Sequence, residues 1–361
     1  MNALGTTTAI LATLFLPLVV ATTETRSTPD DDAGAAARLI RPAAQPREPI
    51  IDVHMHALAA AAQGPPPLGM CTPFPEYAPW DPATPYGASF LAKFKKPACA
   101  DPVWSPVTDD ELMKQTLAIA ERANVIGVLS GPAERVAAWA KANPRRFIRG
   151  LIFQLGEKDT ASPDALRAMH ARGELEVFGE VTNQYAGIAP DDPRMEPYWA
   201  LAEELDMPVG IHIGTGPPGA VYLGASGYRA RLHSALTIED VLVRHPKLRV
   251  YIMHAGYPML DDLLAVLYAH PQVYVDVGII VYNQPRGAFY RYLQAIVDSG
   301  FATRVMFGSD QMVWPGTIER AIDVIEQAPL LSREQKRDIF YNNAARFLRL
   351  SKEDMARHRQ F

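Results

Sequence analysis

The sequence has no excess of basic residues. Its 361 residues include 35 Lys and Arg against 40 Asp and Glu, which gives a net charge of −5 at pH 7. This balance gives no electrostatic support for binding nucleic acid or an anionic membrane surface, so we expect neither as a partner. Hydrophobic residues make up 48% of the chain, which is enough for a large core. The expected partner is a small-molecule substrate, and the sequence leaves open a homodimer.

The N-terminal apolar run, Ala9 to Val20, is too short to span a bilayer comfortably. It fits the apolar segment of a signal peptide, and Val19 and Ala21 suit a small-residue cleavage site. We therefore predict a signal peptide over residues 1–21, a flexible linker over 22–48, and a periplasmic or secreted protein with no stable membrane span after cleavage. No Lys or Arg precedes the apolar run, so an uncleaved anchor and a misassigned start codon are the alternatives.

Cysteine is scarce. Cys71 and Cys99 are the only two in the chain, and both lie between residues 57 and 107. An exported protein keeps disulfides, because they persist in oxidising compartments. We therefore predict a Cys71–Cys99 disulfide, and the alternative is two buried free thiols that share a loop.

From Ile50 onward, apolar strand signals alternate with helix signals. The eight expected strands are Ile50–His54, Val125–Leu129, Phe147–Gln154, Glu176–Val181, Pro208–Ile213, Arg249–His254, Val273–Val277 and Arg304–Phe307. Each is followed by a helix pattern, such as Asp109–Ala123, which opens with a capping box from Thr108 to Glu111. Eight β/α units are the number that a closed barrel needs. We predict an α/β fold, a TIM-type (β/α)8 barrel over residues 49–350, with a C-terminal tail at 351–361.

The stretch 57–107 interrupts the first β/α unit. It is rich in Pro and in aromatic residues, including Phe74, Tyr77, Trp80 and Phe90. A loop of this length inside a compact domain is usually functional or disordered, and the aromatic content argues against disorder. Because it leaves from the end of the barrel where active sites lie, we predict a lid insertion. The alternative is a packing flap that never contacts substrate.

Five polar residues close four of the apolar runs. They are His54 and His56 in Ile-Asp-Val-His-Met-His, His212 in Val-Gly-Ile-His, His254 in Tyr-Ile-Met-His, and Asp310 in Phe-Gly-Ser-Asp. Side chains two apart share one face of a strand, so His54 and His56 should both point into the barrel mouth. Imidazole and carboxylate groups are good zinc ligands. A pair of hydrogen-bonded loop histidines is the alternative for His54 and His56 alone, but the other strand ends favour a catalytic metal site.

These motifs resemble the amidohydrolase superfamily, in the amidohydrolase-related branch that includes aminocarboxymuconate-semialdehyde decarboxylase. The resemblance runs from about Ile50 to Leu348. It also rests on Phe-Gly-Glu-Val around Glu180, Arg-His-Pro-Lys-Leu before the sixth strand, and Tyr-Asn-Asn-Ala-Ala-Arg-Phe-Leu near the end. Singly each motif is modest, and in this order and spacing they are specific.

The resemblance implies a role for each site residue. His54, His56, His212 and Asp310 would bind metal, and Asp310 would also handle a proton. His254 would polarise substrate or act as an acid or base.

Members of this superfamily with two metals carry a bridging carboxylated Lys at the end of the fourth strand. Here that strand ends Phe-Gly-Glu180-Val, without a Lys. We therefore expect one divalent metal per chain, with zinc as the first expectation, although ligand type separates zinc from manganese poorly. We expect Glu180 to lie beside the metal or to contact the substrate, and direct binding of the metal is the alternative.

Three neutral imidazoles and one carboxylate leave a coordination position for water, whose pKa then falls toward about 7. Asp310 can accept the proton of that water, and His254 can stabilise charge on a carbonyl oxygen. We predict a metal-dependent hydrolase of an amide, ester or lactone. The same residues suit a non-oxidative decarboxylase of a small aromatic or unsaturated acid, which is the first alternative. The second is a binding protein with a vestigial site.

Other polar residues receive more ordinary interpretations. Arg229 and Arg231 lie in a Gly- and Pro-rich loop, where they either bind a substrate carboxylate or are simply solvated. Asp276 is expected to hydrogen-bond inside the barrel. Surface positions are expected for His170, His233, His270 and His358.

Overall fold

The computed structural model describes residues 47–77, 79–157, 160–214 and 216–360. The expected signal peptide and nearly all of the expected linker lie outside these residues, so both stay predictions. Within the described part of the chain, no helix is both long and apolar enough to cross a membrane.

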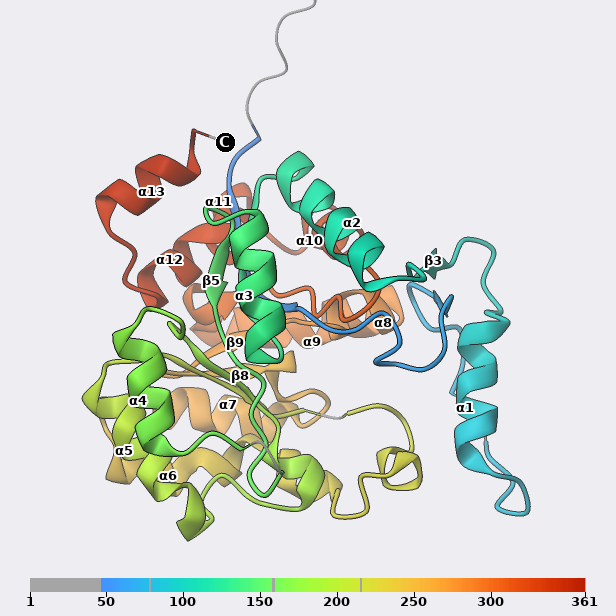
Figure 1. Ribbon diagram of the computed structural model, residues 1–361, viewed down its shortest axis with the longest axis horizontal. Helices are drawn as coiled ribbons and strands as arrows, with labels where there is room; N and C mark the ends of the chain where they lie inside the picture. Colours follow the sequence, from blue (N-terminus) through green and yellow to red (C-terminus); the bar gives the residue numbers. More distant parts are fainter. Residues whose placement is uncertain (1–46, 78, 158–159, 215, 361) are drawn as a thin grey trace, which may run out of the picture. The chain divides into compact units, whose positions relative to one another are not determined.

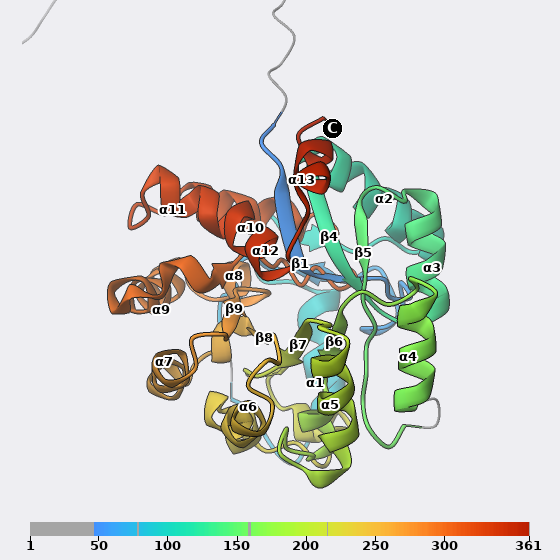
Figure 2. The same ribbon diagram turned by 90° about the vertical axis from the view of Figure 1, so that its left-hand side faces the viewer.

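Eight parallel strands form the centre of the protein, and their apolar sequences explain why they are largely buried. In chain order they are β1 (Ile50–His56), β4 (Val125–Ser130), β5 (Phe147–Arg149), β6 (Phe178–Val181), β7 (Val209–His212), β8 (Val250–Met253), β9 (Tyr274–Asp276) and β10 (Val305–Met306). Regular ladders join β1, β4 and β5 in one sheet and β6 to β10 in another. Figure 2 shows the strands at the centre, with helices around them.

Further hydrogen bonds close the two sheets into one barrel. The amide of Val53 donates to the carbonyl of Phe307 at 3.0 Å, which joins β1 to the residue after β10. On the other side, Phe153 forms a parallel bridge with Val181 of β6. The predicted (β/α)8 barrel is therefore confirmed. The third strand was expected to run to Gln154, but its regular ladder ends at Arg149.

Helices follow the strands and cover the outside of the barrel. They include α2 (Asp109–Arg122), α3 (Ala133–Ala142), α4 (Pro163–Ala171), α5 (Glu196–Glu204), α6 (Glu239–Arg244), α7 (Leu260–Ala269), α9 (Arg286–Ile296) and α10 (Thr317–Glu326). The predicted capping box opens α2, where the side chains of Thr108 and Glu111 each accept from the other residue's backbone amide. The later part of the chain also has short helices, which are α8 (Ile280–Asn283), α11 (Arg333–Arg337), α12 (Asn343–Phe347) and α13 (Lys352–His358).

Apolar side chains fill the barrel at its N-terminal end. This inner cluster contains Ile51, Val53, Val128, Val177, Tyr251, Met253 and Met306 from the barrel, with Tyr341, Ala344, Ala345 and Phe347 from the C-terminal helices. Figure 2 shows α12 and α13 in front of this end of the strands. His358 of α13 is buried, 3.0 Å from the hydroxyl of Tyr341 through Nδ1. The expected surface position of His358 is therefore wrong, because the last residues fold back as a helix.

The insertion, residues 57–107, has secondary structure of its own. It contains α1 (Tyr86–Lys95) and a small antiparallel pair, β2 (Gly69–Met70) with β3 (Val103–Trp104). Cys71 and Cys99 form a disulfide with their Cα atoms 5.8 Å apart. The predicted disulfide is thus confirmed.

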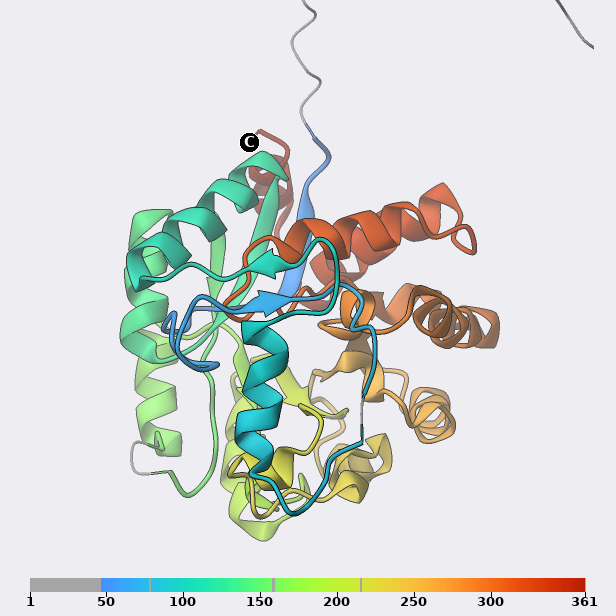
Figure 3. The same cartoon turned by 90° about the vertical axis from the view of Figure 1, so that its right-hand side faces the viewer.

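The insertion lies over the end of the barrel opposite α12 and α13 (Figures 1 and 3). It is held there by the loops that follow the strands. Tyr86 donates its hydroxyl hydrogen to the carbonyl of Pro218 at 2.6 Å, and the indole of Trp314 donates to the carbonyl of Leu68 at 2.9 Å. This position suits the predicted lid, whose movement and substrate contact stay predictions.

Candidate metal centre

Strand β1 presents two histidines at the barrel mouth. The ring centroids of His54 and His56 are 5.1 Å apart. The register of β1 against β4 shifts between Asp52 and Met55. This irregularity lets two consecutive residues face different surroundings, Val53 the inner apolar cluster and His54 the barrel mouth. Asp52 stabilises this irregularity, because its Oδ1 accepts from the amides of His54 and Ser309 at 3.0 and 2.9 Å. The sequence therefore places its imidazoles where the apolar interior ends.

Asp310 follows β10 and is tied to β1 by the backbone. Its amide donates to the carbonyl of His54 at 2.7 Å, and its own carbonyl accepts from the hydroxyl of Tyr282 at 2.8 Å. The next residue, Gln311, brackets His56: its Oε1 accepts from the His56 amide at 3.0 Å and its Nε2 donates to the His56 carbonyl at 2.7 Å. These contacts hold the first and last strands in register across the mouth.

Four side chains whose atoms can bind a metal face one another at the barrel mouth. The Nε2 atom of His56 lies 2.9 Å from Asp310 Oδ1 and 3.5 Å from Glu180 Oε2. The Nε2 atom of His54 lies 3.7 Å from Asp310 Oδ1 and 3.9 Å from Glu180 Oε2. All four residues are at most 6% exposed. The structure therefore brings Glu180 closer to the cluster than the sequence analysis expected.

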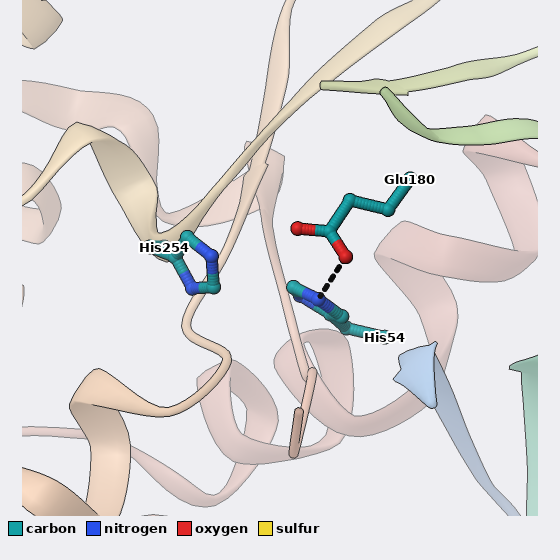
Figure 4. Close-up of side chains that lie close together, drawn as sticks. All are labelled: His54, Glu180 and His254. Atoms are coloured by element: carbon teal, nitrogen blue, oxygen red, sulfur yellow. Dashed lines mark ion pairs between the residues drawn. The ribbon is translucent and has the colours of Figure 1, made fainter. Parts of the chain in front are cut away.

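His254 reaches the same space from the end of β8. Figure 4 shows the imidazoles of His54 and His254 and the carboxylate of Glu180 converging from three different strands. Two sets of residues have donor atoms within 4.8 Å of one another: His54 with Glu180 and His254, and His54 with His56 and Asp310.

His212, at the end of β7, lies on the other side of Glu180. Its Nδ1 is 2.6 Å from Glu180 Oε1 and 3.1 Å from His254 Nε2. Its Nε2 is 3.1 Å from the hydroxyl of Tyr185, a residue of the turn that follows β6 (Asn183–Ala186). The nitrogen of His212 that faces the cluster is therefore Nδ1.

The buried carboxylates are stabilised as anions. Burial raises the pKa of Glu180, but its contacts with His212 and His54 outweigh burial and hold the pKa well below its ordinary value. Burial also raises the pKa of Asp310, and the charges of His54 and His56 lower it overall. Two ionised carboxylates beside imidazoles, which bind a metal in their neutral form, make a strong site for a cation.

Asp276 of β9 has the internal role that the sequence suggested. Its Oδ2 lies 3.1 Å from His54 Nδ1, and its Oδ1 accepts from the amides of His254 and Gly278 at 3.1 and 2.7 Å. A carboxylate accepts, so Nδ1 of His54 carries the proton and Nε2 is left to face the cluster.

The protonation of His254 follows from one contact. Its Nδ1 lies 3.0 Å from the carbonyl oxygen of Gly278, and a carbonyl can only accept, so Nδ1 carries the hydrogen. Burial, together with the charges of His212 and His54, lowers the pKa of His254 to about 4. The neutral ring therefore presents Nε2 as an acceptor, which suits a base.

The donor set fits a divalent metal. The Nε2 atom of His54 is buried without a hydrogen-bond partner, which is costly unless something else binds it. Ligand atoms at 2.0–2.2 Å from a tetrahedral zinc lie roughly 3.4 Å apart, and the separations of Nε2 of His54 and His56 from the two carboxylates, 2.9 to 3.9 Å, bracket that value. Imidazole and carboxylate are also the ligands that such a metal prefers.

The sequence analysis missed a group of aromatic residues beside His212. His233, expected at the surface, is fully buried, with ring centroids 5.6 Å from His212 and 4.5 Å from Tyr228. Tyr185 packs against all three rings. The surface expectation for His233 is wrong because the loop after β7 folds back over the barrel mouth. The position of Tyr185, just after the strand that carries Glu180 and ends at Val181, was the one available signal.

Arg229 and Arg231 are both exposed. The guanidinium of Arg229 donates to the carbonyls of Ser226 and Tyr228, within its own loop. A role for either arginine in binding substrate stays a prediction.

A family model described as Amidohydrolase matches residues 51–350 of the chain. No curated protein matches the sequence.

Solved structures of similar fold cover almost the same region. An uncharacterized TIM-barrel protein from Bordetella bronchiseptica is 19% identical, with a TM-score of 0.54, over 85% of this chain and 99% of that one. A 2,6-dihydroxybenzoate decarboxylase complexed with 2,6-dihydroxybenzoate is 13% identical, with a TM-score of 0.52, over 84% and 99%. A probable 2-pyrone-4,6-dicarboxylic acid hydrolase from Acinetobacter baumannii with citric acid bound is 16% identical, with a TM-score of 0.52, over 83% and 99%. At these identities the likeness establishes the fold and leaves the reaction open.

Proposed function

The chain belongs to the amidohydrolase family, and from that premise we propose that it is a metal-dependent hydrolase of a neutral ester, lactone or amide. The observation that supports this most is the convergence of His54, His56 and Asp310 within 4.8 Å, with the inner nitrogen of His54 buried and unpartnered. His212 would complete the metal ligands through Nδ1. Glu180 lies close enough to join them or to orient His212.

A divalent metal held by these residues would supply the Lewis acidity that makes water a nucleophile at neutral pH. The protein groups then handle the protons. Asp310 accepts a proton from the attacking water as the bond from water oxygen to carbonyl carbon forms. It returns that proton to the leaving oxygen or nitrogen as the bond from carbon to the leaving group breaks. His254 Nδ1 lies 4.0 Å from Asp310 Oδ2, beyond hydrogen-bond distance, so His254 would take up a proton only through its Nε2.

Charge favours hydrolysis over decarboxylation. Glu180 and Asp310 are both ionised, and among the described residues the ion-pair partners found for them are all histidines. One divalent ion would only neutralise the two carboxylates. A substrate carboxylate would then meet no net positive charge, whereas a neutral carbonyl compound needs none.

Mass spectrometry of the product tests the proposal. The purified protein is incubated with a lactone (dihydrocoumarin), an ester (4-nitrophenyl acetate), an anilide (4-nitroacetanilide) and an aromatic acid (2,6-dihydroxybenzoate). Hydrolysis adds one water to the lactone, or splits the ester or anilide, with one oxygen taken from isotopically labelled water. Loss of carbon dioxide from the acid, with the neutral substrates untouched, would instead establish a decarboxylase. The Asp310→Asn protein is the control for contaminating esterases.

A further inference from the structure

Beyond any metal ion, a hydrogen-bond donor to the oxygen that becomes negatively charged accelerates hydrolysis of a carbonyl compound. The histidines of the mouth are poorly placed to provide one. The Nδ1 hydrogen of His54 is directed to Asp276 at 3.1 Å, and that of His254 to the carbonyl of Gly278 at 3.0 Å. The outer nitrogen of His56, Nδ1, is buried on the side of the ring away from Asp310. A hydrogen-bond donor that assists the metal would therefore come from another residue.

Tyr185 would gain a free hydroxyl hydrogen when a metal binds His212. Its oxygen lies 3.1 Å from His212 Nε2, while His212 Nδ1 faces Glu180 and His254. Without a metal, Nδ1 faces two acceptors and carries the hydrogen, so Tyr185 donates to Nε2; a metal bound through Nδ1 would move the hydrogen of His212 to Nε2. The hydroxyl oxygen of Tyr185 then accepts from His212, and the hydrogen of Tyr185 is available for another acceptor.

The phenol also lies close to the reacting space. Its ring centroid is 4.8 Å from that of His212, whose other nitrogen faces Glu180 and His254. Tyr185 is partly exposed, whereas His212 is buried. Gly216 approaches so closely that a Cβ there would lie 2.5 Å from the Tyr185 oxygen. The loop after β7 is therefore shaped around this hydroxyl group.

We propose that Tyr185 is a catalytic residue whose hydroxyl donates a hydrogen bond to the carbonyl oxygen of the substrate as the tetrahedral centre forms. The inference rests on the proposed hydrolase function and names a donor that would assist it. It also restricts the substrate class to compounds that present a carbonyl oxygen beside His212.

Tyr185→Phe and Tyr228→Phe form the test, assayed on whichever of dihydrocoumarin, 4-nitrophenyl acetate and 4-nitroacetanilide the wild type hydrolyses. Tyr228 is the matched control, because its ring packs in the same cluster but its hydroxyl accepts from the amide of Gly216 at 3.4 Å. Loss of one donor to a developing oxyanion lowers kcat by about 10²–10³-fold. We expect that loss for Tyr185→Phe with little change in KM, and a kcat within about twofold of wild type for Tyr228→Phe, since no such donor is removed.

Zinc affinity, measured by competition with a chelator, separates catalysis from positioning. We expect Tyr185→Phe to bind zinc nearly as tightly as the wild type. If its affinity falls and excess zinc restores kcat, Tyr185 only orients His212 and the inference is overturned. An unchanged kcat with unchanged zinc affinity overturns it as well. If the wild type hydrolyses none of the three compounds, the hydrolase proposal itself fails, whatever the Tyr185→Phe protein does.

Discussion

The two ends of the barrel differ sharply, although the same strands build both. At the N-terminal end, Ile51 and Val53 belong to a largely apolar cluster with Tyr341 and Phe347. At the C-terminal end, His54 begins a cluster of imidazoles and carboxylates that is equally buried. One strand passes from one environment to the other between consecutive residues.

The difference separates stability from chemistry. Burying apolar side chains stabilises the fold, while burying charged groups costs free energy unless each is paired. The polar end pairs many of its groups with one another, and leaves several buried atoms unpartnered, among them Nε2 of His54 and Nδ1 of His56. We infer that the apolar end holds the barrel together and that the polar end is kept for binding a metal and substrate. This division leads to four predictions.

Asp310→Asn should have the largest effect, at the polar end. The change keeps the shape of the side chain but removes its charge and its ability to accept a proton. We expect kcat to fall by at least about 10³-fold, within the range for lost acid–base catalysis, with little change in the free energy of unfolding. The control is Asp323→Asn, the same substitution at an exposed position of α10. Full activity in the Asp310→Asn protein would show that this carboxylate takes no part in the reaction.

Phe347→Ala, at the apolar end, should lower stability and leave catalysis intact. Phe347 is buried, with ring centroids 5.6 Å from Tyr251 and 4.9 Å from Tyr274. Removing the ring should lower the free energy of unfolding by about 3–5 kcal/mol, measured by denaturant titration. Activity of the folded fraction should stay near that of the wild type. A large loss of kcat without a loss of stability would show that the two ends are coupled.

The Cys71→Ser/Cys99→Ser double variant tests whether the insertion serves the polar end. The disulfide closes a loop of 28 positions, for which the chain-entropy model gives roughly 3.6 kcal/mol. Because α1 depends on this bond and on a few contacts with the barrel loops, we expect KM to rise while kcat is kept. Wild-type protein treated with a reductant should behave in the same way. An unchanged KM would identify the insertion as a packing flap.

Of the four changes, His254→Asn should have the smallest effect, and this effect should be on kcat. If His254 handles protons without binding metal, kcat should fall about 10²-fold while metal content stays close to normal. His170→Asn is the matched control, because His170 lies on α4 and contacts the carbonyl of Leu175. Loss of metal from the His254→Asn protein would make this histidine a ligand and would reject its assigned role.

The sequence predicted the barrel well because each strand is an apolar run that ends in a turn or a polar residue. It placed α2 within one residue of its observed bounds. It was less accurate where pairing depends on a distant partner: β5 ends at Arg149 because the chain beyond it pairs irregularly with β6.

At the candidate site, too, the sequence predicted what depends on local spacing and missed what depends on distant contacts. His54 and His56 could be predicted because their spacing is local, although the register shift that lets them follow Val53 could not. Tyr185 and His233 meet His212 only after two loops fold over the mouth. No local pattern in the sequence marks such a contact, and composition alone suggested a surface position for His233.

Metal content of the purified protein tests the central claim most directly. The account predicts close to one divalent ion per chain, activity that is lost on treatment with a chelator, and recovery when zinc is added back. A fully active preparation that contains no metal and is unaffected by chelators would contradict it.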